Sequence, residues 1–345
     1  MRSPPIRKCF LYVFFALVSI TNVMWIVSSY WLNRRLRHNA FNVTYRENVT
    51  SAMSVTIRIT VLAEKPVCSA PDKLVGVMKM NMAEMIKTYH DLNASVSTQS
   101  TRSGGFAFEP DSCKPKLSVA IIIPFRDRED HLKTLLGHLH PILLRQNLRF
   151  QVFVVEQSGN GTFNKGRLMN TGFLYAKNEA KTHFDCYIFH DVDMLPEDDR
   201  NLYSCETTTN RVYHLSCSVS KFNYKPLCCG MTVGGVLSFS ENQYIKVNGF
   251  PNDYWGWGGE DDDMNSRIKL QGLRVGRPAL GLCRYCMIEH ERDHFNPYTE
   301  NVVNDRVAAA NQKAKISGLN NLKTNTTGVT NRPLYTHLYV DVGTQ

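Results

Sequence analysis

Four consecutive carboxylates close a short tryptophan- and glycine-rich segment of this chain. The segment runs from Trp255 to Asp263, and it ends with Glu260, Asp261, Asp262 and Asp263. Charges of one sign repel each other at this spacing, so a fold keeps such a run only where the charges have partners or a task. The glycines before the run permit tight turns and a close approach of the backbone to a ligand. We therefore expect a ligand-facing loop that leads into a helix, whose first turn favours acidic side chains.

A second acidic signal, Asp191-Val192-Asp193, follows an apolar run at 186–190 that reads as a buried strand. Alternate residues of a strand face the same side, so both carboxylates are expected to project together from its C-terminal end. Open α/β sheets bind ligands at that end. The pair therefore predicts a site for a divalent cation. An isolated Asp-x-Asp can also be a solvated strand end.

Strand and helix patterns alternate around this signal. Such alternation indicates an α/β fold with a mostly parallel, Rossmann-like central sheet and flanking helices. No Gly-x-Gly-x-x-Gly opens a helix, which argues against a dinucleotide-dependent oxidoreductase. The patterns predict strands at 117–123, 150–155 and 185–190, and helices at 72–90, around 132–139 and at 167–180.

Composition indicates a globular domain and argues against a nucleic-acid partner. Of the 345 residues, 43% are hydrophobic, which is enough for a sizeable core. The formal net charge is +9, but lysine and arginine are scattered and no nucleic-acid-binding motif accompanies them.

The N-terminal part differs from the rest of the chain. A run without charges at 10–32 is long enough to cross a bilayer, and basic residues precede it. No small-x-small cleavage pattern follows, which favours a retained signal anchor over a removed signal peptide. We predict a cytoplasmic tail at 1–9, a transmembrane helix at 10–32, a polar lumenal stem at 33–65 and a lumenal globular domain at 66–345.

Sequons and cysteines indicate which side of the membrane the body occupies. Basic residues flank the anchor at both ends, so charge alone does not orient it. Nine of the ten cysteines lie beyond the anchor, which agrees with an oxidising compartment and leaves at least one thiol unpaired. N-glycosylation also requires a lumenal position. The sequons begin at Asn42, Asn48, Asn93, Asn160 and Asn325.

Around the two acidic signals the sequence resembles the β-1,4-galactosyltransferase family. The resemblance covers residues 66 to 345, and the segment from Tyr254 to Asp263 is its most specific landmark. It implies a glycosyltransferase A-type fold, a UDP-sugar donor, and a single-pass type II membrane protein of the Golgi with a lumenal catalytic domain. The other landmarks, in the family's order, are residues 122–128, 163–165, 191–193, 234–236, 248–252 and 287–290.

The resemblance implies a Mn²⁺ ion held by Asp193, Met287 and His290. Carboxylate, thioether and imidazole ligands suit several transition metals, so the choice of manganese rests on the family. Such a cation would offset the charge of the departing UDP. Asp261 is implied as the base that takes the proton of the acceptor hydroxyl, with Glu260 beside it. One base and a metal-held leaving group imply a single displacement with inversion.

The family match also assigns residues to the two substrates. Lys165 stands where members usually have arginine, which keeps the charge but loses the planar fork. Trp257 could stack on a sugar ring from a glycine-hinged flap. The implied donor-binding residues are Pro124, Phe125, Arg126, Arg128, Phe163, Lys165, Asp191, Val192, Lys221, Thr232 and Trp257. The implied acceptor-binding residues are Gly235, Trp257, Gly258, Gly259, Glu260, Asp261 and Asp262.

Donor choice stays open, whereas acceptor choice is narrower. Thr232-Val233-Gly234-Gly235 replaces the Tyr-Phe-Gly-Gly of galactose-specific members, so UDP-N-acetylgalactosamine is a candidate donor beside UDP-galactose. Gly259 and Asp263 match members that use terminal N-acetylglucosamine rather than xylose. We therefore expect β1,4 transfer to N-acetylglucosamine on a glycoprotein or glycolipid. A catalytically silent, membrane-anchored lectin-like protein and a metal-independent glycosidase are the alternatives.

The resemblance further pairs Cys68 with Cys113 and Cys186 with Cys205. The remaining lumenal cysteines have no partner assigned by the family. The spacing Cys283-x-x-Cys286 could suggest zinc, but no second ligand pair lies nearby in the sequence. The unassigned cysteines are Cys217, Cys228, Cys229, Cys283 and Cys286.

Overall fold

The computed structural model describes residues 65–98, 107–227, 232–291 and 310–345. The predicted tail, anchor and nearly all of the stem lie outside the described residues, as do Asn42 and Asn48. Among the residues described, no helix is long and apolar enough to cross a bilayer. Residues Pro66–Gln345 form one compact unit.

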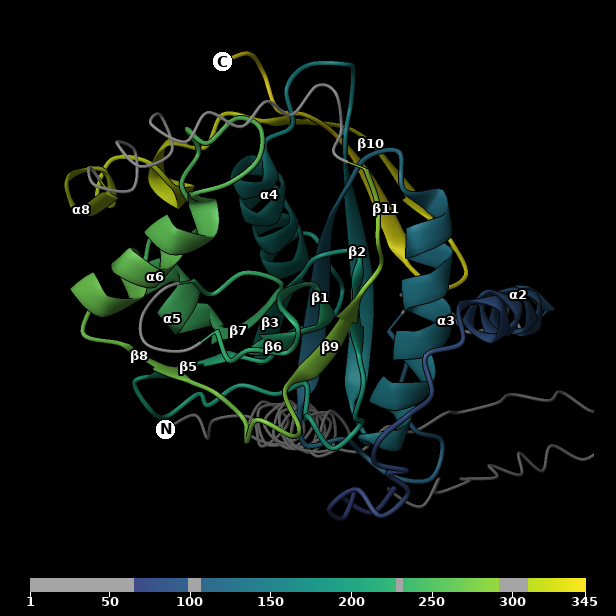
Figure 1. Ribbon diagram of the computed structural model, residues 1–345. Coiled ribbons are helices and arrows are strands. Elements are labelled where there is room, and N and C mark those ends of the chain that lie inside the picture. Colours follow the sequence, from purple (N-terminus) through teal and green to yellow (C-terminus); the bar gives the residue numbers. More distant parts are fainter. Residues whose placement is uncertain (1–64, 99–106, 228–231, 292–309) are drawn as a thin grey trace, which may run out of the picture. The chain divides into compact units, whose positions relative to one another are not determined.

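An eight-stranded sheet runs through the centre of this unit (Figure 1), in the order β10-β11-β2-β1-β3-β7-β5-β8. Strands β11, β2, β1 and β3 are parallel neighbours, and β5 and β8 are also parallel. The pairs β3–β7, β5–β7 and β10–β11 are antiparallel. The mostly parallel sheet is therefore confirmed. The strands are β1 Ser118–Phe125, β2 Arg149–Gln157, β3 Cys186–His190, β5 Arg211–His214, β7 Val236–Ser240, β8 Arg274–Gly276, β10 Asn325–Asn331 and β11 Thr336–Asp341.

Helices cover both faces of the sheet, which explains why the central strands are apolar throughout. All eight residues of β1 are buried. Ile121 and Ile123 pack in the core under helix α3, whereas Ala120 and Ile122 pack in the core under α4. Figure 1 shows α2 and α3 on one face and α4, α5 and α6 on the other. The helices are α2 Met82–Thr98, α3 Glu129–Arg145, α4 Lys165–Asn178, α5 Glu241–Lys246, α6 Glu260–Leu270 and α8 Ala310–Lys313, with 3-10 turns η1 Ser220–Phe222 and η2 Leu319–Asn321.

A second, three-stranded sheet has the order β4-β9-β6. Its strands are β4 Met194–Pro196, β9 Arg284–Met287 and β6 Ser218–Val219. Strand β9 lies in the middle, antiparallel to β4 and parallel to β6. None of these strands was predicted, because each is too short to show a periodic pattern.

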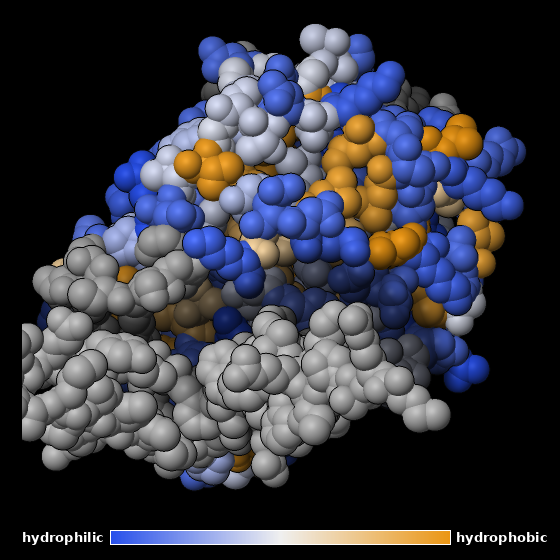
Figure 2. All heavy atoms as spheres, turned by 180° about the vertical axis from the view of Figure 1, so that it is seen from behind, coloured by the Kyte–Doolittle hydropathy of each residue, from blue (hydrophilic) through white to orange (hydrophobic). Residues whose placement is uncertain are grey.

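The outer surface seen in Figure 2 is mainly hydrophilic, with apolar side chains gathered in small groups.

The predicted helix at 72–90 is wrong in its first half. Helix α2 begins only at Met82 and continues to Thr98. Before it, the backbone amides of Val75 and Gly76 donate to the buried carboxylate of Asp199, at 2.9 and 2.8 Å. Gly76 also has a φ of +80°. These contacts with a distant loop replace the hydrogen bonds that a helix would have formed, although the apolar spacing resembles a helix.

Both disulfides implied by the resemblance are confirmed. Cys68 is bonded to Cys113, and Cys186 to Cys205. A third bond, not predicted, joins Cys217 to Cys283. This bond rules out a metal site made from Cys283 and Cys286, and Cys286 keeps a free thiol.

Three of the sequons lie among the described residues. Asn160 and Asn325 are exposed, whereas Asn93 lies half-buried within α2. Their use as glycosylation sites stays a prediction.

Gly137→Ala is expected to destabilise the domain, because α2 crosses α3 at this glycine. A Cβ there would lie 1.9 Å from the carbonyl oxygen of Met85. Overpacking of this kind costs about 1–3 kcal/mol. Thermal unfolding of the lumenal domain should show a lower midpoint for Gly137→Ala. Gly281→Ala is the matched control, since a Cβ there meets nothing within 4 Å. Equal midpoints for both variants would contradict the close packing of the two helices.

Candidate active site

The tryptophan- and glycine-rich segment forms a loop that leads directly into α6, as the sequence predicted. Gly256, Gly258 and Gly259 have φ angles of 87°, 101° and 94°. Residues with a Cβ rarely adopt this conformation, so these turns require glycine. The four carboxylates occupy the first turn of α6, where the helix dipole favours negative charge.

Two of the four carboxylates have partners within their own part of the fold. Asp263 is fully buried and forms an ion pair with Arg267 one helical turn later, at 2.5 Å. The hydroxyl of Tyr254 donates to the same carboxylate at 3.0 Å. Asp263 therefore stabilises the helix and does not face a ligand. Asp262 bonds to the side chain of Thr232, and burial raises its pKa.

The other two carboxylates converge on Lys165, the first residue of α4. The Lys165 Nζ atom lies 3.2 Å from Glu260 and 3.1 Å from Asp261. It also lies 3.1 Å from Asp191, which follows β3. Asn164 caps α4 by accepting a hydrogen bond from the amide of Arg167, at 2.9 Å. The cap fixes where α4 begins and so where the ammonium is placed.

This cluster has unusual electrostatics. Burial, together with the charge of Asp261, raises the pKa of Glu260 to about 7, although Lys165 acts in the opposite direction. Burial likewise raises the pKa of Asp191 to about 7, opposed by Lys165. For Lys165, burial lowers the pKa, but the three carboxylates outweigh it and raise the pKa well above its usual value. The lysine therefore stays charged and holds the cluster together.

Asp191 and Asp193 do not share a strand face, contrary to the expectation from their spacing. Strand β3 ends at His190, and the chain turns immediately after it. The amide of Asp191 donates to the carbonyl of Gly235 at 2.9 Å, and its carboxylate faces Lys165. The carboxylate of Asp193 instead lies 3.1 Å from His290 Nε2. The turn thus gives the two carboxylates different partners.

The three residues implied as metal ligands are brought together by the small sheet. Met194 of β4 is opposite Met287 of β9, and the amide of Ile288 donates to the carbonyl of Asp193 at 2.8 Å. Met287 is therefore the last residue of a strand and lies beside the Asp193 segment. The hydrogen bond from His290 to Asp193 raises the pKa of His290.

This donor set fits a transition-metal ion. The described part of the chain contains no cluster of three or more His, Cys, Asp and Glu residues that could hold a metal. The carboxylate of Asp193 and the imidazole of His290 are in contact, so a third protein ligand would have to be the thioether of Met287. Carboxylate, imidazole and thioether together are compatible with Mn²⁺ without being specific for it.

The two arginines implied as nucleotide-binding residues lie between β1 and α3. Arg128 has one guanidinium nitrogen 3.2 Å from His290 Nδ1 and donates to the carbonyl of Glu291 at 3.1 Å. Arg126 donates to the carbonyl of Gly161 and lies over the ring of Phe163, at 5.2 Å. Arg128 is thus beside the candidate metal ligands, whereas Arg126 lies beside a loop that carries an aromatic ring.

The remaining implied donor residues have mixed positions. Pro124 and Phe125 end β1 and are buried. Val192 is half-buried between the two aspartates. The ammonium of Lys221 lies over the ring of Trp257 at 5.6 Å. Trp257 is 47% exposed, which leaves its ring accessible to a sugar.

Gly234 and Gly235 pack against the side chains of the site. A Cβ on Gly234 would lie 2.5 Å from Asp261 Oδ2, and one on Gly235 would lie 2.6 Å from Ser216 Oγ. Glycine is required at both positions by this close approach. Thr232 accepts a hydrogen bond from the amide of Gly234 through its hydroxyl, at 3.3 Å. Its side chain therefore helps to shape the loop that touches Asp261.

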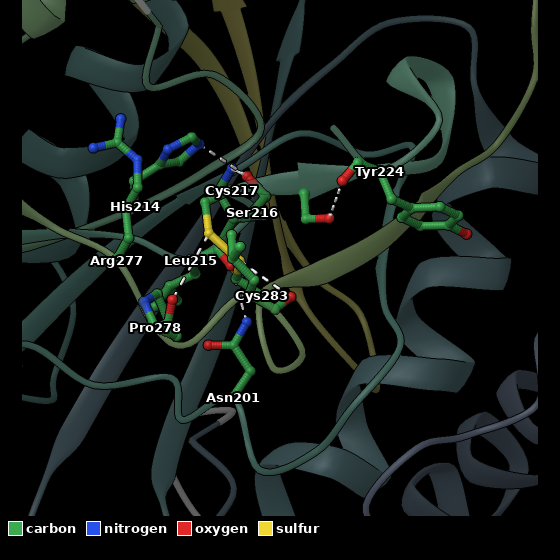
Figure 3. The surroundings of a disulfide bond; sticks show 12 residues. Asn201, His214, Leu215, Ser216, Cys217, Tyr224, Arg277, Pro278 and Cys283 are labelled. Carbon is green, nitrogen blue, oxygen red and sulfur yellow. Dashed lines mark hydrogen bonds between the residues drawn. A yellow bond between two sulfur atoms is a disulfide. The ribbon is translucent and has the colours of Figure 1, made fainter. Parts of the chain in front are cut away.

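Two residues that the sequence did not reveal hold this loop. The hydroxyl of Ser216 donates to the carbonyl of Gly234 at 3.0 Å and accepts from the amide of Val236 at 2.7 Å. His214 Nε2 donates to the same carbonyl at 2.8 Å. Burial lowers the pKa of His214 to about 4, so the ring is neutral. Figure 3 shows both side chains beside a disulfide; no motif in the sequence marks them.

The sequence of this chain is similar to those of known glycosyltransferases. Residues 68–206 match a family model described as the N-terminal region of glycosyl transferase group 7. Residues 213–291 match one described as the N-terminal domain of galactosyltransferase. The chain is 42% identical over 240 residues to β-1,4-galactosyltransferase 2 of Homo sapiens, which covers 69% of this chain and 63% of that relative. It is 41% identical over 242 residues to β-1,4-galactosyltransferase 3 of Rattus norvegicus, covering 70% and 60%.

Solved structures show the same fold. The catalytic domain of Drosophila β1,4-galactosyltransferase 7, in complex with xylobiose, is 27% identical with a TM-score of 0.56. The similarity covers 66% of this chain and 95% of that one. A mutant of the same protein in complex with manganese, UDP-Gal and xylobiose has a TM-score of 0.55 and 26% identity.

The sheet order, the flanking helices and these similarities define a glycosyltransferase A-type fold. The chain belongs to the β-1,4-galactosyltransferase family, within group 7 of the glycosyltransferases. It spans about 60% of the length of the relatives that it matches.

Lys165→Met is expected to destabilise the domain more at about pH 8 than at about pH 5.5, because Glu260 binds a proton as the pH falls. At the higher pH the three carboxylates would repel one another without a shared cation. Removing one partner of a buried ion pair costs roughly 3 kcal/mol. Denaturant unfolding at the two pH values measures the difference. Lys177→Met, which removes an exposed pair with Glu241, is the control. Equal losses for Lys165→Met at both pH values would contradict the cluster.

Proposed function

We propose that this protein transfers galactose from UDP-galactose, in β1,4 linkage and with inversion, to terminal N-acetylglucosamine. The observation that carries the proposal is the position of Asp261, which shares Lys165 with Asp191, while Asp193 two residues later contacts His290. The candidate base is thus linked through Lys165 to Asp191, and a short turn leads from Asp191 to the candidate cation site at Asp193. Membership of the family and the solved relative with manganese and UDP-Gal support the reaction type.

In this proposal Asp261 takes the proton of the acceptor hydroxyl as that oxygen attacks the anomeric carbon. Both of its oxygens lie 3.1 Å from Lys165 Nζ, so the lysine orients the carboxylate. An ionised carboxylate has about four lone-pair positions, which leaves room for the acceptor hydroxyl. Gly234 allows the donor sugar to come close to Asp261 because no side chain intervenes.

The nucleotide end of the donor would lie at Arg128, Asp193 and His290. These residues, with Met287, are the ones that would hold Mn²⁺. When bound, the cation supplies positive charge that offsets the charge developing on the departing UDP. Arg128 adds a fixed positive charge at the same place. The glycine-rich loop with Trp257 would exclude water and so limit hydrolysis of the donor.

The donor sugar and the location of the enzyme belong to the same proposal. Thr232 is smaller than the tyrosine of galactose-specific members, which would also admit the N-acetyl group of UDP-N-acetylgalactosamine. The acceptor is a glycoprotein or glycolipid glycan that ends in N-acetylglucosamine. The enzyme would act in the Golgi as a single-pass type II membrane protein with its catalytic domain in the lumen.

Asp261→Asn and Asp193→Ala are expected to weaken transfer for different reasons. Loss of the base should lower kcat by at least about a hundredfold. Loss of the metal ligand should raise the Mn²⁺ concentration needed for half-maximal activity. Transfer from radiolabelled UDP-galactose to an N-acetylglucosamine acceptor, with EDTA as a further control, measures both effects. Full activity of either variant would overturn the proposed reaction, and glycan binding without transfer would point to a lectin-like protein.

Thr232→Tyr is expected to shift donor use towards UDP-galactose, because the larger ring would exclude an N-acetyl group. The measurement is the ratio of kcat/KM for UDP-N-acetylgalactosamine and UDP-galactose with the same acceptor. Thr232→Val, which removes the hydroxyl but keeps the size, is the matched control. An unchanged ratio in Thr232→Tyr would show that this position does not select the donor.

A further inference from the structure

The disulfide between Cys217 and Cys283 lies where the small sheet begins. Cys217 immediately precedes β6, and Cys283 immediately precedes β9. The two strands form only two register pairs, Ser218 with Arg284 and Val219 with Tyr285. The amide of Ser218 donates to the carbonyl of Cys283 at 3.1 Å. The covalent bond therefore joins the starts of two strands that have few hydrogen bonds of their own.

Strand β9 ends at Met287, and its position depends on both neighbouring strands. On one side β4 pairs with β9, which places Met287 beside Asp193. On the other side Ser220, directly after β6, accepts a hydrogen bond from the amide of Met287 through its hydroxyl, at 2.9 Å. The contact with Ser220 requires β6 to stay beside β9. Three residues of β9 lie between Cys283 and Met287, the candidate thioether ligand.

The same disulfide is linked to the loop that touches Asp261. Ser216, next to Cys217, holds the carbonyl of Gly234, and Gly234 packs against Asp261. The amide of Leu227 donates to the carbonyl of Cys217 at 2.8 Å. Figure 3 shows Ser216 and His214 on the Cys217 side of the bond. The disulfide therefore lies between the strand that carries Met287 and the residues that hold the loop at Gly234.

The segment closed by this bond contains several residues of the proposed site. The two cysteines are 66 residues apart, and Thr232, Trp257 and Asp261 lie between them. A cross-link over such a length restricts the unfolded chain and the relative movement of its two ends. Both cysteines are buried, at 1% and 0% exposure, so the disulfide lies in the interior of the domain. The two disulfides implied by the family resemblance do not include it.

We propose that the Cys217–Cys283 disulfide is a positioning device for the cation site, which keeps Met287 in register with Asp193 and His290. This inference rests on the proposed function, because it assigns the bond to the same site. Cys217 and Cys283 do not touch a substrate; they act through β6, Ser220 and β9. A purely stabilising cross-link would lower stability when removed but would leave metal affinity unchanged.

The test compares two variants that each lose one disulfide. Cys217→Ala/Cys283→Ala removes the bond beside β9, and Cys68→Ala/Cys113→Ala removes a bond outside both sheets. Mn²⁺ binding to the purified lumenal domain is measured by electron paramagnetic resonance of the free ion, without any substrate. We expect the dissociation constant for Mn²⁺ to rise at least about tenfold in the first variant, as for other supporting residues of metal sites. We expect a change of less than about twofold in the second variant.

Transfer assays over a range of Mn²⁺ concentrations give the second readout. Activity of Cys217→Ala/Cys283→Ala should rise as the Mn²⁺ concentration increases, because a higher concentration fills a weakened cation site. Unaltered Mn²⁺ affinity, or an equal loss in both disulfide variants, would overturn the inference while leaving the proposed function intact. If the unmodified protein binds Mn²⁺ but transfers no sugar, the proposed function fails and the binding comparison still decides the role of the bond.

Ser220→Ala keeps the test decisive if the double variant does not fold. It removes the hydrogen bond to the amide of Met287 and leaves the disulfide in place. We expect weaker Mn²⁺ binding with little change in the unfolding midpoint. Ser266→Ala, which removes a hydroxyl bonded within α6, is the control. Equal Mn²⁺ affinity of Ser220→Ala and the unmodified protein would overturn the proposed path from β6 to Met287.

Discussion

The geometry of the candidate site depends on the ion pairs that the ammonium of Lys165 forms with three carboxylates. Asp191, Glu260 and Asp261 lie within 3.2 Å of it and come from two separate parts of the chain. Three carboxylates this close repel one another unless they share a cation. Helix α4 supplies that cation at its first residue, and so fixes the end of β3 and the start of α6 to a single point. The buried core beneath them provides the rigidity that this arrangement requires.

The two sheets contribute different parts of the site. The large sheet places Asp191 at the end of β3 and, just before β7, the glycine Gly234 that packs against Asp261. The small sheet places Met287 beside the Asp193 segment, and Asp193 contacts His290. The turn between β3 and β4 belongs to both, which explains why Asp191 and Asp193 have different partners. The carboxylate that shares Lys165 and the carboxylate that contacts His290 are therefore only two residues apart in the chain.

The elements that were predictable from sequence are those whose burial leaves a pattern. The strands β1, β2 and β3 and the helices α3 and α4 were found close to their observed positions, because long apolar runs and helical spacing reflect local burial. The strands β4, β6 and β9 have two to four residues each and exist through contacts with distant segments. The segment before α2 failed for a related reason, since its amides bond to Asp199, more than a hundred positions away.

By itself, the sequence determined the chemical groups available to the site, the order of the elements that carry them and two of the disulfides, because family landmarks and apolar patterns are local. Only the tertiary structure decided which partner each carboxylate has. Asp263 forms an ion pair with Arg267 of the same helix. Asp261 and Glu260 instead form ion pairs with Lys165, which lies far earlier in the chain. It also decided that Cys217 and Cys283 pair, and that Ser216 and His214 hold the loop at Gly234. Such contacts join residues far apart in the chain, so no local pattern can encode them.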